Sequence, residues 1–392
     1  MKLKYLLFFT GIYFICLINL STLVLTNLSL ANDARYLIEV LAIIVFIVAI
    51  IQEGINLKEI TLVLGLLGIS LIIYLFSKNM QPTYFVLVAF AFRKEAISKI
   101  IKGFFIVYTI LLFSVLLLLK MGLVSSIIQY NSISGLQKPS LGFEQANALG
   151  LVLFIVLISN LYLKSIKERT KVEKFTLRVI DYSFQIFLIY LLYVSGVRSA
   201  QFAVLIAYVY YFILKIKNQK SKRKIMISLT YLLTISSVLF SIFSINNQVL
   251  TQGSFWYNLD GLLSYRLSMG YLYYLQSGLS LLGKPFASIS TNLYQTNITV
   301  DNVFQHALFN LGIIFCIGAL IYFSLIIKKV IEKNQLTLLI PLVSFFVYGL
   351  GESSILYFYA GFIFYFAPIL YQSYLDINNH QELTKIKLEE EI

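Results

Sequence analysis

The sequence predicts an all-α polytopic membrane protein with about 12 transmembrane helices and both termini in the cytoplasm. Hydrophobic residues make up 59% of the chain and charged residues only 12%, and the mean hydropathy is +0.83. An ordinary soluble domain is less apolar than this. Apolar runs near the ~20 residues that cross ~30 Å of hydrocarbon recur along the sequence. Lys and Arg, moreover, gather in alternate connections between these runs.

Each apolar run is expected to form a helix, because backbone polar groups inside a bilayer must be satisfied within the segment and barrel-type alternation is absent. The predicted segments are 5–25, 36–51, 60–76, 80–92, 103–119, 147–163, 179–194, 199–214, 225–245, 303–327, 335–350 and 355–375. The fourth segment is short and contains Pro82, so a re-entrant segment is an alternative there. The first follows Lys2 and Lys4 and lacks an A-x-A cleavage site, so we interpret it as an uncleaved span.

The distribution of cations orients these segments. With the N-terminus inside, 24 of the 31 Lys and Arg residues fall in connections on the cytoplasmic side, as the positive-inside rule requires. That rule also accounts for the net charge of +13, so no nucleic-acid partner is inferred. The cations left on the external side are Arg35, Lys78, Lys120, Lys138, Arg198, Arg266 and Lys284. Of these, Arg35 and Glu39 are interpreted as a structural ion pair.

The chain is predicted to be a single transmembrane domain over residues 1–375, followed by a polar cytoplasmic tail at 376–392. Two external loops are longer than ordinary connections, 120–146 and 246–302, and long structured loops are usually functional. The stretch Leu262–Leu282 is rich in Tyr, Leu and Met, which is typical of an interfacial helix against the outer leaflet. The two cysteines both fall in apolar segments and indicate no disulfide framework.

The motifs of soluble enzymes are missing from the sequence, including nucleotide-binding loops, metalloprotease motifs and nucleophile elbows. No cofactor and no metal site is therefore predicted. The remaining candidates are polar residues at the external ends of the predicted segments.

Arg198 lies in the turn before the eighth segment. The N-terminus of that helix, near Ser199, offers free backbone N–H groups and the positive end of the helix dipole, and Arg198 adds a fork of donors beside them. Gly196 allows a tight turn or a close approach of the backbone to a ligand. Together these residues predict a phosphate-binding site. A plain alternative is an Arg that reaches lipid head groups at the interface.

Arg266 begins the predicted interfacial helix, where a second cation would reach the same anion. Contact with anionic lipid is the ordinary alternative for this residue.

Asp301 precedes the tenth segment, in which Asn302, His306 and Asn310 recur every four residues along one helix face. Polar stripes entering a bilayer tend to face a cavity or the protein interior. His306 is a candidate general base because its reference pKa suits proton transfer at neutral pH. The alternatives are a helix cap at Asp301 and a hydrogen-bonded interior residue at His306.

Glu352 lies in a short external turn between the last two segments, where a carboxylate would orient a sugar hydroxyl or pair with an Arg. Helix capping explains it equally well. Asn147, together with Glu144, lies where the first long loop meets the sixth segment.

Four short motifs, in order, resemble those of the Wzy-type polysaccharide polymerases within the O-antigen ligase/polymerase superfamily. They are Gly142-Phe-Glu-Gln-Ala-Asn147-Ala-Leu-Gly150; Ser195-Gly-Val-Arg-Ser-Ala200; Ser264-Tyr-Arg266 with Leu282-Gly283; and Asp301-Asn302 followed by Leu311-Gly-Ile-Ile314. The motifs cover roughly residues 140–330. The first third of the chain is similar only in being hydrophobic helices.

The resemblance implies a glycosyltransferase of the bacterial cytoplasmic membrane that polymerises undecaprenyl-diphosphate-linked oligosaccharide repeat units at the outer face. It implies that Arg198 and Arg266 hold the diphosphate, with Ser199, Gly196, Asn147 and Asn302 beside the substrate. The base is expected among Asp301, His306 and Glu352. Membrane lipid, a flippase and chain-length regulators are the expected partners. Ligases of the superfamily commonly carry His where this chain has Asp301, which favours a polymerase.

Two alternatives remain open from the sequence. A flippase for lipid-linked oligosaccharide also has about a dozen helices, but it is expected to carry charged residues through the bilayer rather than at one face. A ligase would transfer finished glycan to a different acceptor.

Overall fold

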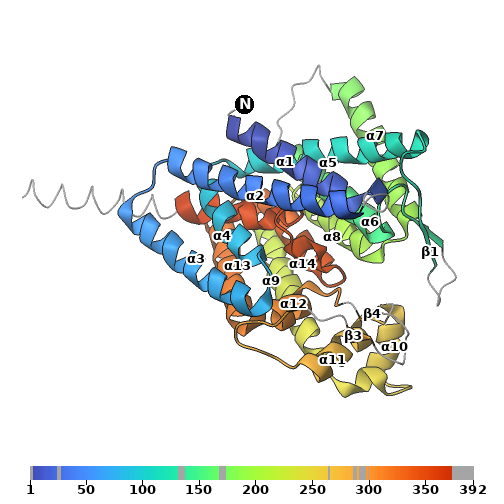
Figure 1. Cartoon of the computed structure of the whole chain (residues 1–392). Coiled ribbons are helices and arrows are strands. Elements are labelled where there is room, and N and C mark those ends of the chain that lie inside the picture. Colours follow the sequence, from blue (N-terminus) through green and yellow to red (C-terminus); the bar gives the residue numbers. More distant parts are fainter. Residues whose placement is uncertain are drawn as a thin grey trace, which may run out of the picture.

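Helices dominate the structure and account for 78% of it. The computed structural model of the chain describes residues 3–23, 28–130, 137–166, 174–263, 265–285, 289–290, 297–298 and 300–372. Figure 1 shows the helices assembled into one bundle, with α10 and α11 (yellow to orange) as a cap at one end. The predicted tail at 376–392 and the side chain of Arg35 lie outside the described part.

The helices and strands follow one another along the chain in this order. The helices are α1 Leu3–Leu20, α2 Leu28–Gln52, α3 Leu57–Ser77, α4 Gln81–Ala91, α5 Ile97–Lys120, α6 Ala146–Ile166, α7 Lys174–Ser195, α8 Arg198–Ile213, α9 Gln219–Phe243, α10 Phe255–Leu262, α11 Arg266–Ser277, α12 Val303–His306, α13 Gly312–Glu332 and α14 Leu339–Gly349. Between and after them lie the shorter turns η2 Asn247–Leu250, η3 Ala307–Leu311, η4 Leu336–Leu338, η5 Ser353–Leu356 and η6 Phe362–Phe366. Two antiparallel ribbons pair β1 Ile128–Tyr130 with β2 Gln137–Pro139 and β3 Ile289–Ser290 with β4 Asn297–Ile298.

Five helical stretches in the described residues are long and apolar enough to cross a membrane: α3, α5, α6, α9 and the run Val303–Glu332. Shorter apolar helices fall on the other predicted segments up to residue 350. The structure is therefore compatible with the predicted all-α membrane class. The short fourth segment is helix α4, and Pro82 occupies its first turn, where the missing N–H costs no hydrogen bond.

Helix α6 forms the centre of the bundle and packs against α5, α7, α8 and α14. Most of its residues are buried within the protein, whereas most residues of the similarly apolar α3 are not. Small residues allow its neighbours to approach. A Cβ atom added at Gly150 would lie 2.7 Å from Val197, in the turn just before α8. This contact brings the first turn of α6 close to the N-terminus of α8.

The run from α12 to α13 is interrupted by a π-helical turn, η3, which ends at Gly312 with φ of +87°. The loop after α11 lies against this break, and its backbone supplies partners to the freed groups: Ile313 N–H donates to Ser280 O and Lys284 N–H to Asn310 O. Gly283 and Gly312 make the contact possible, because a Cβ at Gly283 would lie 2.1 Å from Asn310 O. The Leu282-Gly283 and Leu311-Gly312 motifs are thus in contact.

The last predicted segment, 355–375, is not one continuous helix. The structure has two 3₁₀ turns, η5 and η6, followed by helix at 367–372. Pro368 explains why a regular helix does not continue from η6 through residue 367, because it has no N–H to donate to the carbonyl of Phe364. That carbonyl accepts a hydrogen bond from the hydroxyl of Tyr322 on α13 instead, at 3.1 Å.

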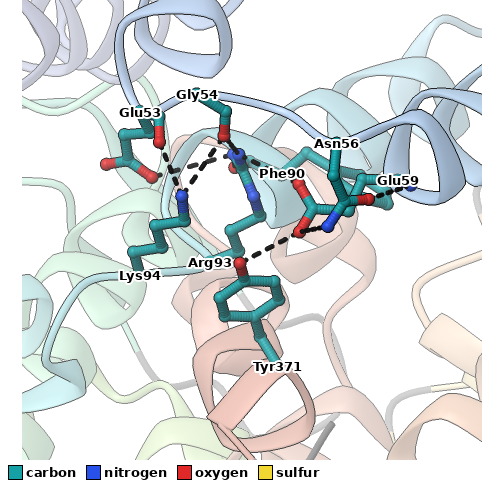
Figure 2. A network of polar contacts seen from close by, with 8 residues as sticks. All are labelled: Glu53, Gly54, Asn56, Glu59, Phe90, Arg93, Lys94 and Tyr371. Atoms are coloured by element: carbon teal, nitrogen blue, oxygen red, sulfur yellow. Dashed lines mark hydrogen bonds and ion pairs between the residues drawn. The ribbon is translucent and has the colours of Figure 1, made fainter. Parts of the chain in front are cut away.

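A network of charges joins α2, α3, α4 and the 367–372 helix, at the end of α3 and α4 away from their connecting turn (Figure 2). Arg93, only 2% exposed, donates to the carbonyls of Phe90 and Gly54, both at 2.6 Å. Its guanidinium lies 3.3 Å from Glu59 Oε2, and Glu59 accepts a 2.9 Å hydrogen bond from the hydroxyl of Tyr371. Through Arg93 and Glu59 the network thus ties together three segments distant in sequence, 53–59, 90–94 and the helix that contains Tyr371.

Replacing Arg93 by Ala is expected to destabilise the protein by roughly 3–5 kcal/mol, because the mutation leaves the buried carboxylate of Glu59 without its cation. Thermal unfolding of the purified protein in detergent measures this loss. Lys94→Ala is the matched control, since Lys94 is exposed and its ammonium binds only backbone carbonyls in this turn. Equal unfolding temperatures for the two variants would show that the network contributes nothing.

Candidate functional site

Four segments distant in sequence meet around the guanidinium of Arg266, the first residue of α11. Its Nη2 lies 2.9 Å from Glu352 Oε1, and its Nε lies 3.2 Å from Asp301 Oδ2. The hydroxyl of Ser199, in the first turn of α8, donates to the same Glu352 oxygen at 3.4 Å. The structure thus brings together Ser199, Arg266, Asp301 and Glu352, all candidates from the sequence.

Arg266 is held in place by the corner between α10 and α11. The side chain of Asp260, buried near the end of α10, accepts hydrogen bonds from the N–H groups of Leu267 at 2.7 Å and Ser268 at 3.1 Å. It therefore caps α11 from a distance, while Tyr265 turns the chain with φ of +62°. The predicted interfacial helix over 262–282 is broken at this corner. Sequence reasoning missed Asp260, because only the folded corner shows what its carboxylate binds.

Asp260→Ala is expected to free the first turn of α11 and displace Arg266, since two buried amides lose their acceptor. We expect a loss of about 0.5–2 kcal/mol in the local stability of α11. Hydrogen exchange of the amides of Leu267 and Ser268 measures it. Asp260→Asn keeps the accepting oxygen and should stay close to wild type. Unchanged exchange in the Ala variant would contradict this role.

Glu352 is almost fully buried between α8, α11 and α14. Burial raises the pKa of its carboxyl to about 7; Arg266 opposes this rise and the charge of Asp301 adds to it. Burial acts to lower the pKa of Arg266, but the two carboxylates outweigh it, so that pKa is raised. Near neutral pH the guanidinium is charged and Glu352 is poised to exchange a proton.

The neighbouring Gly351 allows this close arrangement. A Cβ atom at that position would lie 2.5 Å from Arg266 Nη1 and 2.8 Å from Ser199 Cβ. Any side chain there would push Arg266 or α8 away from Glu352.

Two further cations approach Arg266. Arg198, the exposed first residue of α8, donates to the carbonyl of Leu262 at 3.0 Å. Lys138, on β2, lies along Gly196, whose φ is +63° and whose added Cβ would be 3.1 Å from the Lys138 side chain. Burial lowers the pKa of Lys138, and the positive charges of Arg266 and Arg198 lower it further.

We call Lys138, Arg198, Arg266, Asp301 and Glu352 the charged cluster. Within the described residues, neither Arg198 nor Lys138 has a carboxylate within ion-pair distance. Three cations held near one another repel, and a bound anion relieves that repulsion. Sequence reasoning had counted Lys138 among the external cations, but its position in a long loop gave no reason to select it.

Asn302 lies outside the charged cluster. It is buried, its Oδ1 accepts from the N–H groups of Phe304 and Gln305, and its Nδ2 donates to Ser241 on α9 at 2.9 Å. In this structure Asn302 caps α12 and fastens it to α9.

His306 and Asn310 also bind protein partners. The Nδ1 atom of His306 lies 3.2 Å from Val300 O, while Asp301 acts on the ring through its charge. Asn310 Nδ2 donates to Lys284 O at 2.7 Å, and its Oδ1 accepts from Asn79. The π-helical turn begins after His306 and includes Asn310, so the predicted stripe of polar residues at four-residue spacing is not a regular helix face.

Asn147 lies in the first turn of α6, one turn before Gly150, which contacts the turn leading to Arg198. Among the described residues, no group of three or more His, Cys, Asp or Glu side chains is arranged to hold a metal ion.

Comparisons with protein-family models, with curated proteins and with solved structures found no match to this chain. The chemistry that the charged cluster supports therefore follows from its own geometry. That geometry offers three cations, a helix N-terminus and two carboxylates at one end of a set of apolar helices.

Proposed function

We propose that the chain polymerises undecaprenyl-diphosphate-linked oligosaccharide repeat units into surface polysaccharide at the outer face of the bacterial cytoplasmic membrane. The observation that carries this proposal is the convergence of Lys138, Arg198 and Arg266 beside the N-terminus of α8. A diphosphate has the charge and the acceptor oxygens that such a group of donors binds. The family resemblance of the sequence supports the same substrate class.

The proposed topology has 12 membrane segments, with the charged cluster outside and the Arg93 network inside. Contacts between segments support this grouping. Pieces assigned to the outside meet one another, as in Lys138 with Gly196 and Arg198 with Leu262. Pieces assigned to the inside also meet, as in Arg223 with Ile331 and Arg93 with Glu59.

In the proposed reaction, a hydroxyl oxygen of the acceptor sugar attacks the anomeric carbon of the donor glycan. The bond between that carbon and the phosphate oxygen breaks, and its electron pair leaves with the undecaprenyl diphosphate. Arg198, Arg266 and Lys138 stabilise the charge that develops on the leaving group. Glu352 accepts the proton of the attacking hydroxyl, since its carboxylate lies within this group and its pKa is about 7. Asp301 holds Arg266 in place.

The size of the surface glycan in a deletion strain, with lipid-linked intermediates labelled, tests this function. Loss of high-mass polymer, with single repeat units accumulating on the external face, is the expected result. Single units trapped on the cytoplasmic face would indicate a flippase instead. Polymer of normal length that is not attached to its acceptor would indicate a ligase.

Arg198→Ala is expected to reduce chain growth strongly while the protein still inserts and folds, because Arg198 is exposed and its only hydrogen bond in the described structure is to one backbone carbonyl. Arg198→Lys should recover activity only in part, since an ammonium cannot make the paired hydrogen bonds of a guanidinium. Polymer length on gels, with membrane expression as control, measures both variants. Normal polymer from Arg198→Ala would show that Arg198 does not take part in substrate binding.

A further inference from the structure

A cationic hollow lies at the start of α9. Its lining residues are Lys220, Arg223, Lys224, Ile227 and Ser228. The other end of α9 is close to the charged cluster, since Ser241 there binds Asn302, the residue after Asp301. The hollow is therefore at the opposite end of this helix. In the proposed topology that end faces the cytoplasm, and the proposed reaction does not use it.

The charge of the hollow is not neutralised within the described part of the chain. No carboxylate there lies within ion-pair distance of Lys220, Arg223 or Lys224. Arg223 donates to the carbonyl of Ile331 at 3.5 Å, which brings the end of α13 next to the hollow. The carboxylate at that end, Glu332, forms its ion pairs with lysines of α13 itself. Three cations thus face solvent or a ligand without a balancing charge.

The position of these cations opposes the local electrostatics of the helix. A helix N-terminus is the positive end of the dipole and favours acidic side chains, yet the first six residues of α9 include four cations and no acid. Capping does not require them, because Asn218 already accepts from the N–H groups of Lys220 and Ser221. The positive-inside rule requires cations on this side of the membrane, but not at a helix start. A bound anion offsets both the dipole and the mutual repulsion.

The hollow leads onto an apolar face of α9. Lys220, Lys224 and Ile227 are followed on the same helix face by Tyr231 and Ile235, since these positions recur every three or four residues. Tyr231 and Ile235 are 44% and 53% exposed. They belong to a helix that is long and apolar enough to cross a membrane, so in a bilayer this face contacts lipid. The cations are therefore next to a surface that an acyl chain can cover.

We propose that this hollow binds the headgroup of an anionic glycerophospholipid of the inner leaflet, with an acyl chain along Tyr231 and Ile235. Basic pockets between transmembrane helices on the cytoplasmic side bind lipids of this class. A zwitterionic lipid offers the same phosphate but adds a cation of its own, which the uncompensated charges of the hollow repel. An acidic protein segment has the charge but lacks the apolar chain. The leaflet follows from the proposed topology, and the proposal does not depend on the proposed reaction.

Native mass spectrometry of the full-length protein tests the proposal. The protein, purified in detergent, is titrated with phosphatidylglycerol and, separately, with phosphatidylcholine of the same acyl chains. We expect the first phosphatidylglycerol to bind at least about tenfold more tightly than the first phosphatidylcholine. Added salt should weaken this binding, because exposed charges are screened.

Removing the charges of the hollow is expected to abolish the preference for phosphatidylglycerol. Lys220→Gln/Arg223→Gln/Lys224→Gln removes three charges and keeps side chains that favour a helix. Each cation beside an anionic lipid contributes up to about fivefold to binding, so the affinity of the triple variant should fall to that for phosphatidylcholine. Lys224→Glu, which places a carboxylate in the hollow, is the second variant, so that a folding defect in the triple variant does not decide the result.

The matched control removes the same number of charges from the same side of the proposed topology. It replaces by Gln three exposed cations that do not line the hollow, Lys58, Lys99 and Lys102. The control should bind phosphatidylglycerol as wild type does.

Equal affinity of the wild type for the two lipids, or an equal loss of affinity in the control and in the hollow variants, would overturn the proposal. Displacement of the lipid by inorganic phosphate at the same concentration would also overturn it, because that result indicates a site for a free anion. Binding of an acidic peptide in place of the lipid would do the same. A protein that binds the lipid but makes no polymer would contradict the proposed function and leave this inference intact.

Discussion

Arg266→Ala is expected to abolish chain growth and leave only single repeat units on the lipid carrier. Arg266 is the one cation of the charged cluster that contacts both carboxylates, at 2.9 Å from Glu352 and 3.2 Å from Asp301. Removing a donor that stabilises developing charge on a reacting group typically costs about 10²–10³ in rate. This mutation also leaves Glu352 buried without its cation. Electrophoresis of the surface glycan, with labelled lipid-linked intermediates, measures the effect.

Lys284→Ala is the matched control for Arg266→Ala. Lys284 is an exposed cation in the loop after α11, and its ammonium binds the carbonyl of Ser277 and not the charged cluster. Its polymer should have wild-type length. Arg266→Lys should restore part of the activity, because Lys carries the positive charge but lacks the paired hydrogen-bond donors of the guanidinium. Full-length polymer from Arg266→Ala would contradict the diphosphate-binding role.

Glu352→Gln is expected to lower the polymerisation rate by about 10²–10⁴, the range for loss of a general base. The wild-type rate should rise with pH around 7, because the base acts in its deprotonated form and burial places the pKa of Glu352 at about 7. Below that pH the carboxyl is protonated and cannot accept the hydroxyl proton. The Gln variant should lose this dependence. Rates of reconstituted protein across the pH range measure both effects.

Asp301→Asn distinguishes the role of Asp301 from that of Glu352. In the proposed mechanism Asp301 positions Arg266, so its amide variant should weaken substrate binding more than it changes the pH dependence. A Glu352→Gln enzyme that keeps the wild-type rate and pH profile would remove Glu352 as the base. The role would then pass to Asp301 or His306.

Most residues that the sequence identified and the structure brings together are polar groups at the ends of apolar segments, while Arg266 lies in the long connection between α9 and α12. Charge asymmetry between loops singled out Arg198 and Arg266, and short turns singled out Glu352 and Ser199. Because helix ends on one side of a membrane lie near one plane, polar residues at those ends lie close to one another. This is why loops distant in sequence could be expected to meet.

Features that depend on irregular backbone could not be predicted in the same way. The π-helical turn at 307–311 arises where the loop around Gly283 contacts Gly312, and it breaks the periodicity from which a polar stripe was inferred. At the break before residue 367, Pro368 leaves the carbonyl of Phe364 without a helical donor, and the hydroxyl that replaces it comes from Tyr322 on another helix. Lys138 and Asp260 are selected only by tertiary neighbours, since neither lies in a periodic pattern.

The most direct test of the central claim is polymerisation by purified protein in proteoliposomes supplied with a lipid-linked repeat unit and no nucleotide. If the proposed function is right, wild-type protein gives a ladder of glycan sizes with one lipid diphosphate released for each new linkage, and Arg266→Ala gives no ladder. Absence of a ladder from folded, membrane-inserted wild-type protein, or a ladder that Arg266→Ala leaves intact, would contradict the proposed function.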